Sequence, residues 1–274
     1  MSLSREMPRV LTPSDLEAAL KLSTAAGWNQ APEDWLRVMR LAPEGCFGID
    51  ADGSLAATAT VVCYGADLAW IGMVLTDPAM RGRGFARRLM EHAIAGVSVS
   101  WIKLDATDMG LPLYRKLGFV DECAIERWAV EAAPGCLDAH PSGPADGRTS
   151  SDDQALLDDR AALGADRSAL FAILEEEGHL SGRPGARAAY FGPCASATLE
   201  GAMARLCPFL DQNKGKPVYW DLFPDNRNAA GLAAEFGFKP VRRLTRMVRP
   251  GIENPKTLAS DPSLIYAIAG FEYG

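Results

Sequence analysis

The stretch TDPAMRGRGFA at residues 76–86 decides how the rest of the sequence is interpreted. It ends a β-like run and precedes a segment with helical spacing, in which Phe85, Leu89 and Ala93 share one face. Its two glycines let the backbone turn tightly and direct amides at one point, and the helix N-terminus adds partial positive charge. The stretch therefore predicts a pyrophosphate-binding loop. A purely structural β-to-α turn is the alternative for so short a motif.

Three β-like runs lead up to this loop, at residues 45–50, 55–64 and 68–76. Asp52 and Gly53 between the first two are a hairpin signal, so we expect an antiparallel meander. A dinucleotide-binding fold would instead begin with a βαβ unit and carry G-x-G-x-x-G. The sequence therefore argues against dinucleotide binding.

Helices and further strands are expected around this meander. Pro13 and Pro32 mark the starts of two helices, and the second should bury its Trp35, Val38 and Met39 face. After the loop helix we expect a strand at 101–106, a helix capped by Asp108 that ends at Gly118, and a strand at 120–130.

An internal repeat predicts the domain organisation. The sequence LGF at 117–119 with Arg127 recurs as FGF at 236–238 with Arg246, at the same spacing, after the related runs 101–106 and 218–223. Residues 132–154 between the copies are dense in Pro, Gly, Ser and Asp, as in a linker. Helical material should follow at 155–178. The apolar run 264–271 is expected to form a last strand within its own half, and pairing across to the first half is the alternative.

The composition restricts the class of protein. A chain of 274 residues accommodates two domains, and a net charge of −7 with a pI near 5.1 gives no basic face for nucleic acid. An acidic surface attracts cationic amines. No signal peptide or membrane-spanning run is evident, so we expect a cytoplasmic protein.

Cysteine and histidine spacing indicates neither a metal site nor a disulfide framework. The three histidines have no i, i+4 partner and the six cysteines contain no C-x-x-C pair, so most of the thiols should be reduced.

Two motifs together resemble the GNAT superfamily of N-acetyltransferases. Residues 76–86 match that family's R-x-x-G-x-G/A loop, and YRKLGF at 114–119 matches its Tyr-x-x-Leu-Gly-Phe ending. The resemblance covers about residues 8–130 well. It implies an α/β fold of two GNAT-like domains, each with a mixed, mostly antiparallel sheet, a central parallel strand pair and flanking helices. The expected bounds are 1–133 for the first domain, 134–152 for a linker and 153–274 for a degenerate second domain.

The resemblance also implies a set of cofactor contacts for acetyl-CoA, with no metal. Backbone groups of Val74, Leu75 and Thr76 should meet the pantetheine arm, and one of the first two should offer an amide to the developing oxyanion. The pyrophosphate would be held by Arg81, Gly82, Arg83, Gly84, Phe85 and Ala86. Thr107 stands where the family commonly has an asparagine, which puts one cofactor contact in doubt.

Tyr114 matches the family tyrosine that protonates the departing thiolate, and its alternative is a core aromatic residue. Asp105 is a candidate general base, or a carboxylate that caps the following helix. Trp28 and Asn29 resemble a loop that borders the acceptor pocket in tandem GNAT proteins, or they cover the meander.

The second half resembles the C-terminal domain of such tandem proteins. Its counterpart of the loop, residues 192–201, has no arginine and no paired glycines, and Glu200 would repel phosphate. Asp221, Asp225 and Asn226 could bind an amine, or serve as a turn and helix cap. No tyrosine stands four residues before Gly237.

The sequence thus predicts an acyl-CoA-dependent N-acetyltransferase that acts on a primary amine by direct attack in a ternary complex. The acceptor is a small molecule or a protein amine, with no nucleic acid and no membrane partner. The alternative is a sensor that binds acyl-CoA or another ligand without turnover. Nothing in the sequence indicates the oligomeric state.

Overall fold

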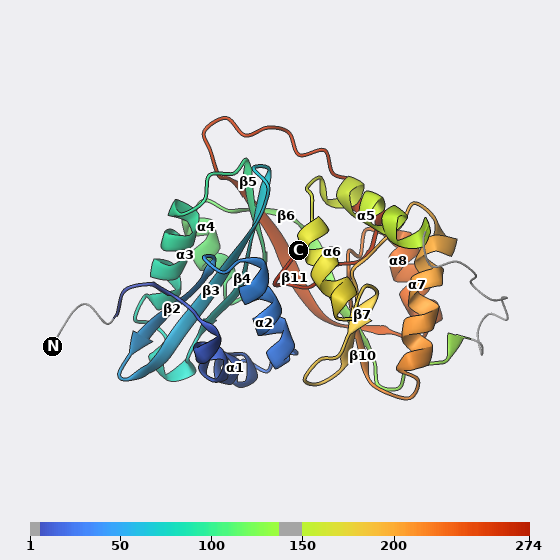
Figure 1. The fold of residues 1–274 in the computed structure, drawn as a ribbon, viewed down its shortest axis with the longest axis horizontal. Coiled ribbons are helices and arrows are strands. Elements are labelled where there is room, and N and C mark those ends of the chain that lie inside the picture. The colour runs from blue at the N-terminus through green and yellow to red at the C-terminus, as the bar shows by residue number, and fades with distance from the viewer. Residues whose placement is uncertain (1–5, 137–149) are drawn as a thin grey trace. The chain divides into compact units, whose positions relative to one another are not determined.

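The computed structural model describes residues 6–136 and 150–274, which belong to two compact units (Figure 1). Unit 1 comprises residues 1–121, 247–256 and 271–274, and unit 2 comprises residues 122–246 and 257–270. These bounds differ from the expected division at a linker, since segments from late in the sequence belong to unit 1. Residues 137–149 of the expected linker lie outside the described residues.

Unit 1 is built on a sheet with the strand order β1-β2-β3-β4-β5-β11. Its strands are β1 (Arg9–Val10), β2 (Cys46–Ala51), β3 (Ser54–Tyr64), β4 (Leu68–Thr76), β5 (Trp101–Ala106) and the end of β11 (Lys239–Pro250). The expected antiparallel meander of β2, β3 and β4 is confirmed. Asp52 and Gly53 both have positive φ, +51° and +85°, as a tight hairpin between twisted strands requires.

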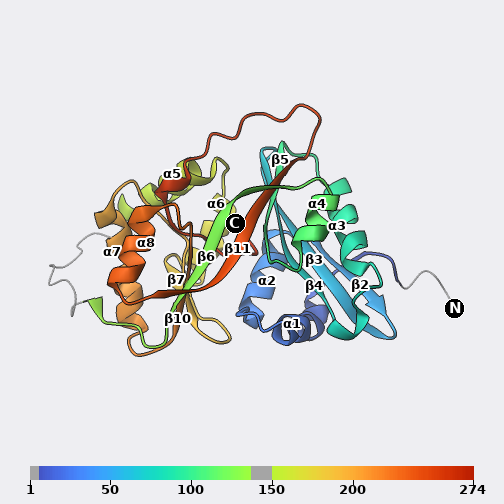
Figure 2. The same cartoon turned by 180° about the vertical axis from the view of Figure 1, so that it is seen from behind.

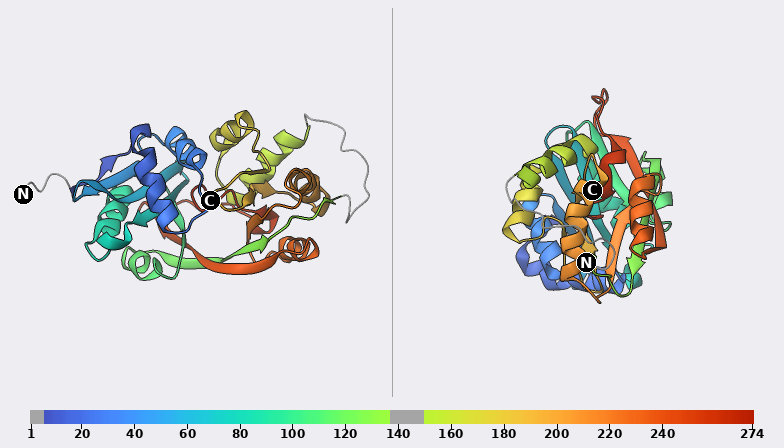
Figure 3. Two further views of the ribbon diagram at one scale, coloured as in Figure 1. Left: turned by 90° about the horizontal axis from the view of Figure 1, so that it is seen from below. Right: turned by 90° about the vertical axis from the view of Figure 1, so that its right-hand side faces the viewer.

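Helices cover both faces of this sheet. α1 (Leu16–Ala25) and α2 (Pro32–Leu41) lie on one face, and α3 (Phe85–Ala95) and α4 (Leu111–Lys116) lie on the other (Figures 1 and 2; left panel of Figure 3). Short 3-10 turns precede α1 at Pro13–Asp15 and α3 at Pro78–Met80. The helix α2 buries Trp35, Val38 and Met39 as expected from their i, i+3, i+4 spacing.

The expected cap of α4 is wrong in its position. The helix is capped at Gly110 and not at Asp108, because the carbonyl of Thr107 accepts hydrogen bonds from the amides of Gly110 and Leu111, at 2.8 and 3.2 Å. Asp108 lies exposed in this backbone turn. The turn closes through main-chain atoms, and such a closure leaves no side-chain signature in the sequence.

Unit 1 takes its last strand from the second half of the sequence. Residues 247–256 belong to it, and there the end of β11 neighbours β5. The amide of Gly251 donates to the carbonyl of Ser100 at 2.9 Å, and Arg249 Nη1 donates to the carbonyl of Leu117 at 2.7 Å. Conversely, most of β6 (Val120–Val130), which follows the first Gly-Phe pair, belongs to unit 2.

Unit 2 is built on the strand order β11-β6-β10-β8-β7, with a separate pair of β12 and β9. Its further strands are β7 (Gly182–Arg183), β8 (Ala189–Phe191), β9 (Cys194–Ala195), β10 (Val218–Leu222) and β12 (Ile265–Ala267), the last preceded by a 3-10 turn at Pro262–Leu264. β6 pairs with β10 in antiparallel register and β8 pairs with β10 in parallel. The expected pairing of the last strand within its own half is confirmed for β12.

The helices of unit 2 are α5 (Ser150–Leu163), α6 (Ser168–Glu176), α7 (Leu199–Gln212) and α8 (Arg227–Glu235). The helical material expected over 155–178 forms most of α5 and all of α6, which are separate because Gly164 has φ +79° and ends the first. With parallel pairs β4–β5 and β8–β10 in mostly antiparallel sheets flanked by helices, the expected fold class is confirmed.

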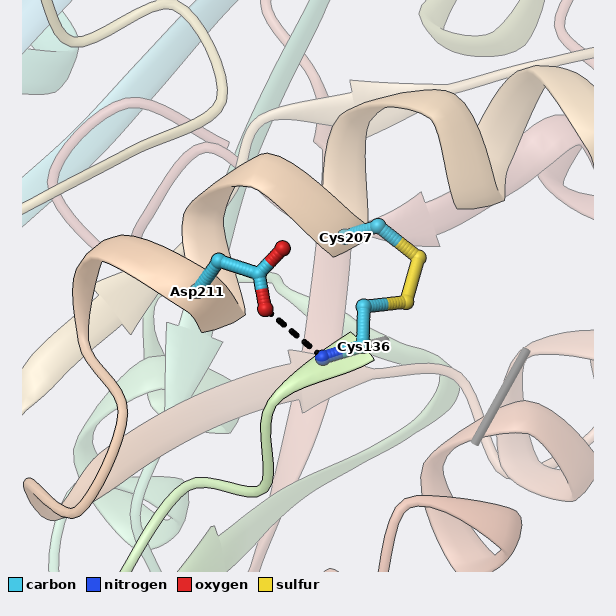
Figure 4. The surroundings of a disulfide bond; sticks show 3 residues. All are labelled: Cys136, Cys207 and Asp211. Atoms are coloured by element: carbon cyan, nitrogen blue, oxygen red, sulfur yellow. Dashed lines mark hydrogen bonds between the residues drawn. A yellow bond between two sulfur atoms is a disulfide. The ribbon is translucent and has the colours of Figure 1, made fainter. Parts of the chain in front are cut away.

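A disulfide that the sequence did not indicate joins Cys136 to Cys207 on α7 (Figure 4), while the other four cysteines are reduced, as expected of most of them. The two residues are 71 positions apart, with Cα atoms 5.0 Å from each other. The carboxylate of Asp211 accepts from the amide of Cys136 at 2.8 Å and holds the segment after β6 against the helix. Tertiary structure alone brings the two thiols together. Burial raises the pKa of the free thiols of Cys46 and Cys194 to about 12.

Within the described residues, the helices are too short or too polar to span a lipid bilayer.

Candidate functional site

The strand β4 is irregular halfway along its length. Its ladder with β3 pairs Thr60 with Gly72 and then Thr58 with Leu75, so three steps on β4 face two on β3. Met73 takes φ +47°, which is unusual for a side chain of its size, and its carbonyl accepts from Thr58 Oγ1 at 2.8 Å. This β-bulge turns the backbone of Met73 and Val74 out of the regular ladder direction.

The bulge lies where β4 and β5 part. Their parallel ladder covers Leu68–Trp70 and Trp101–Lys103, and in the described chain it does not continue to Thr76 and Ala106. In the described chain, Leu75 and Thr76 pair with β3 on one side, and the β4–β5 ladder gives Val74–Thr76 no partner on the other side. Strand edges of this kind can pair with an extended ligand such as a pantetheine arm.

The glycine-rich loop follows β4 directly. Gly82 and Gly84 have φ +82° and +80°, and a Cβ atom built at either position would meet nothing within 4 Å. Gly84 is the N-cap residue of α3, and glycine has no side chain to accept a hydrogen bond from the first amides of that helix. Both glycines are exposed. The loop thus has the open backbone and the available helix amides that a phosphate group requires, and the residues present fit a bound pyrophosphate.

The arginines of the loop differ in their surroundings. Arg81 is exposed and forms no ion pair within the part of the chain that the structure describes. Arg83 pairs with Asp52 and, at 2.8 Å, with Glu6, and its guanidinium lies 4.9 Å from the Phe85 ring centroid. Of the two predicted arginine contacts, Arg81 is therefore the one whose charge is not already neutralised.

Tyr114 lies in the core of unit 1. It packs edge-on against Phe119 at 6.2 Å between ring centroids, and it shares one hydrophobic cluster with Phe85 and the partly buried Val74. A Cβ at Gly110 would clash with its ring, so glycine there makes room for the side chain. Burial raises the pKa of the Tyr114 hydroxyl well above its ordinary value, so it is a neutral proton donor at physiological pH.

The other predicted residues of the first half are less well defined in role. Thr107 closes the turn before α4 through its carbonyl, and Asp105 is partly buried on β5. Trp28 is partly exposed in the connection between α1 and α2, where its amide donates to the carbonyl of Ser23 at 3.0 Å, and Asn29 is buried. The structure therefore places all the predicted site residues in unit 1.

Sequence analysis missed Gln30 and Glu272. Gln30 Nε2 donates to the Glu272 carboxylate at 3.2 Å, and both side chains are buried. The two residues stand 242 positions apart, and no motif links them. An isolated acidic residue at the end of the apolar run 264–271 was the only available signal.

The polar residues singled out in unit 2 have internal partners. Asp221 is fully buried and forms a double hydrogen bond with Arg127, at 2.8 and 2.7 Å. Asn226 accepts from the amide of Ala229 at 3.2 Å and caps α8, while Asp225 is exposed. The interpretation as a helix cap therefore holds for Asn226, and Asp221 forms an ion pair with Arg127.

The counterpart of the glycine-rich loop in unit 2 is built differently. Thr198 caps α7, and its hydroxyl accepts from the amide of Gly201 at 3.1 Å. Ser196 Oγ accepts from the amide of Thr198 at 3.2 Å. Side-chain hydroxyls thus already accept hydrogen bonds from two backbone amides of this turn. Across the described residues, no group of three or more His, Cys, Asp and Glu side chains is arranged to hold a metal ion.

Comparisons with known proteins agree with this geometry. Residues 42–121 match the family model described as an acetyltransferase (GNAT) domain. No curated protein matches the sequence.

Several solved structures share the fold. A Pyrococcus horikoshii protein assigned as an acetyltransferase superposes with a TM-score of 0.78 at 20% identity, over 100% of this chain and 98% of the other. A GCN5-related N-acetyltransferase from Sphaerobacter thermophilus gives 0.61 at 15% identity, over 95% and 100%. A tandem GNAT protein from the clavulanic acid biosynthesis pathway gives 0.58 at 15% identity, over 90% and 99%.

At these identities the structural likeness establishes the fold, and the family model identifies the domain. Within unit 1, residues 42–121 match a GNAT acetyltransferase domain, the family that the two sequence motifs resemble.

Proposed function

We propose that this protein is an N-acetyltransferase that binds acetyl-CoA in unit 1 and acetylates a primary amine by direct attack. The observation that carries this proposal is the glycine-rich loop itself. Behind a bulged β4, two left-handed glycines leave the first amides of α3 without a side-chain cap. Helix amides arranged in this way are exposed to solvent and free to bind an external anion such as a phosphate group.

In this proposal Arg81 and the backbone of residues 82–86 hold the pyrophosphate, and Val74, Leu75 and Thr76 hold the pantetheine arm. Arg83 contributes less to pyrophosphate binding than its place in the motif suggests, because Asp52 and Glu6 already neutralise its charge. Bound acetyl-CoA supplies an acetyl group activated as a thioester.

Three further roles fall to residues of the chain: stabilising the oxyanion, donating to the leaving thiolate and accepting a proton from the amine. A backbone amide at Val74 or Leu75 stabilises the negative charge that develops on the thioester oxygen. Tyr114 is protonated at neutral pH, since burial raises the pKa of its hydroxyl, and that hydroxyl is proposed to donate a hydrogen bond or a proton to the leaving thiolate. Asp105 remains a candidate for the base that takes a proton from the attacking amine.

Unit 2 is proposed to bind no acyl-CoA, since hydroxyl groups occupy amides of its corresponding turn. The expected stoichiometry is one acetyl-CoA per chain.

The test is release of free CoA thiol from acetyl-CoA, followed with a thiol reagent, in the presence of a panel of primary amines. Release that depends on both an amine and the protein supports the proposal. Acetyl-CoA binding in calorimetry without any amine-dependent release would assign unit 1 to ligand sensing instead.

A further inference from the structure

The bulge of β4 lies between two anchored flanks. Before the bulge, a Cβ at Gly72 would lie 2.8 Å from Glu272 Cα, so only glycine allows these two backbones of unit 1 to approach so closely. After the bulge, the amide of Asp77 donates to the carbonyl of Ala56 on β3 at 2.8 Å. The irregular part of the strand is therefore confined to the short segment between these contacts.

The conformation of Met73 sets the orientation of one peptide group in this segment. Its φ of +47° lies in the left-handed region, which a residue with a long side chain rarely adopts. Its carbonyl accepts from Thr58 Oγ1 at 2.8 Å, and both residues are buried. A side chain of the neighbouring strand, shielded from water, thus holds the carbonyl of the left-handed residue.

The same peptide group carries the amide of Val74. The peptide between Met73 and Val74 is trans, so its N–H points opposite to its carbonyl. Because the carbonyl is directed at Thr58 on β3, the amide of Val74 is directed away from β3. On that side the neighbour of β4 is β5, whose ladder with β4 ends at Trp70 and Lys103, before the bulge.

The amide of Leu75 has the opposite direction. In an antiparallel ladder, pairs that exchange hydrogen bonds alternate with pairs that do not. Asp77 donates its amide to β3, so Leu75, two positions earlier and opposite Thr58, also directs its amide at β3. Of the two amides considered for the oxyanion, that of Val74 is the one directed away from the ladder with β3.

We propose that Thr58 is a positioning residue for acetyl transfer, which holds the Met73 carbonyl and thereby aims the Val74 amide at the thioester oxygen. The inference rests on the proposed function, in which a backbone amide stabilises the developing oxyanion. In this role Thr58 touches neither cofactor nor substrate and acts through one peptide group. Without its hydroxyl this peptide group can rotate, and the amide loses its fixed direction.

Thr60 on the same strand provides a matched control. It lies two positions after Thr58, so its side chain projects from the same face of β3, and both residues are 0% exposed. Its hydroxyl has no hydrogen-bond partner within the described chain. Valine at either position removes a buried hydroxyl at nearly constant volume, but only Thr58→Val removes a hydrogen bond to the bulge.

The first measurement is steady-state release of CoA thiol with n-butylamine as acceptor. A misplaced oxyanion donor should lower kcat about 10- to 100-fold in Thr58→Val. Thr58→Ser retains the hydroxyl and should keep the wild-type kcat, as should Thr60→Val. The proposal is overturned if Thr58→Val keeps the wild-type kcat, or if Thr60→Val loses as much as Thr58→Val.

Calorimetry isolates the interaction with the thioester oxygen. S-Ethyl-CoA has a methylene group in place of the thioester carbonyl and otherwise matches acetyl-CoA. Wild type should bind acetyl-CoA about 2- to 10-fold more tightly than S-ethyl-CoA, as one hydrogen bond between neutral groups provides. In Thr58→Val this preference should disappear, while the Kd of S-ethyl-CoA stays at the wild-type value. An equal loss of affinity for both ligands would assign Thr58 to packing and refute the proposal.

A second pair of variants covers the case in which Thr58→Val does not fold. Thr58→Ser and Thr58→Ala both lack the γ-methyl group and differ only in the hydroxyl, so the same kinetic and calorimetric differences are expected between them.

Failure of the proposed function would be seen separately, as absence of amine-dependent thiol release by wild type that still binds acetyl-CoA. Calorimetry then decides on Thr58 alone. A preference for acetyl-CoA over S-ethyl-CoA that Thr58→Val abolishes and Thr60→Val retains would sustain the inference. A preference that Thr58→Val retains, or wild type that binds both ligands equally or binds neither, would refute it.

Discussion

The turn before α3 in unit 1 and the turn before α7 in unit 2 differ in which groups accept hydrogen bonds from the first amides of the helix. Before α7 in unit 2, the hydroxyls of Ser196 and Thr198 accept from the amides of Thr198 and Gly201. Before α3 in unit 1, Gly84 provides no side chain, and no side chain caps the helix. The turn before α7 thus has side-chain acceptors for its amides, whereas the N-cap of α3 supplies none and leaves its amides to solvent or to a ligand.

The difference extends beyond the turns. The helix α7 carries Glu200 in its first turn and is tied by a disulfide, whereas α3 carries Ala86 and has Arg81 before it. The core of unit 1 contains Tyr114 four residues before Gly118, and Ala233 occupies the same place before Gly237 in unit 2. The comparison indicates that backbone amides without a side-chain acceptor, at the start of a helix, are a useful sign of a ligand site.

The largest effect is expected at Tyr114, the side chain that unit 2 lacks. Tyr114→Phe removes the hydroxyl and keeps the ring, so kcat for acetyl transfer should fall roughly 10²- to 10⁴-fold. Since burial raises the pKa of this hydroxyl above 10, the wild-type kcat should not decline through its ionisation between pH 8 and about 10. Steady-state kinetics across this pH range provide the measurement.

The Kd of acetyl-CoA and the melting temperature of Tyr114→Phe serve as controls and should stay at wild-type values. Unchanged turnover in this variant would reduce Tyr114 to a packing residue.

The disulfide on α7 should affect stability without affecting the cofactor. Because it closes a loop of about 70 residues, its reduction should lower the free energy of unfolding by about 2–4 kcal/mol. Denaturant titrations with and without dithiothreitol measure this, and Cys136→Ser should make the protein insensitive to the reductant. A weaker acetyl-CoA affinity after reduction would contradict the assignment of α7 to a structural role.

The glycine-rich loop should tolerate no side chain. Gly84→Val places a β-branched residue at φ +80°, which shifts the backbone and removes at least one hydrogen bond to phosphate. We expect the Kd of acetyl-CoA to rise about 10- to 100-fold in calorimetry. Gly215→Val is the matched control, because Gly215 has φ +76°, an open Cβ position and no part in the loop. Equal losses in both variants would attribute the effect to backbone strain.

The smallest effect is expected at the cap of α7. Thr198→Gly removes the hydroxyl that accepts from Gly201 and should reduce stability by a few tenths of a kcal/mol, while Thr198→Ala should cost about 0.5–2 kcal/mol. Calorimetry should still give one acetyl-CoA per chain for both. A second bound equivalent in Thr198→Gly would mean that the cap alone suppresses a site in unit 2.

Local patterns in the sequence predicted the local parts of this structure. The meander followed from the strand-like runs and from Asp52-Gly53, whose positive φ angles the turn requires. The loop at 76–86 followed from its glycines, and β4, β5 and β6 were placed correctly to the residue. Each of these features depends on neighbours within about a dozen positions.

Features that depend on distant residues were not predictable. The pairing of Cys136 with Cys207 spans 71 positions, and the contact between Gln30 and Glu272 spans 242. Likewise, nothing local in Val120–Val130 indicates that most of the strand belongs to the other unit. A side-chain pattern specifies which face of a strand is buried, but not which sheet supplies the partner.

The assignment of Met247–Lys256 and Phe271–Gly274 to unit 1 has a consequence for how the protein is made. Synthesis on the ribosome proceeds from the N-terminus, and domains ordinarily fold as they emerge. Unit 1 cannot complete its fold in this way. The partner strand of β5, at the end of β11, and the segment that packs on Gly72, at Glu272, are translated only after most of unit 2. Contacts of such high sequence separation slow folding. Unit 1 is therefore complete only after Met247–Lys256 and Phe271–Gly274 have been synthesised.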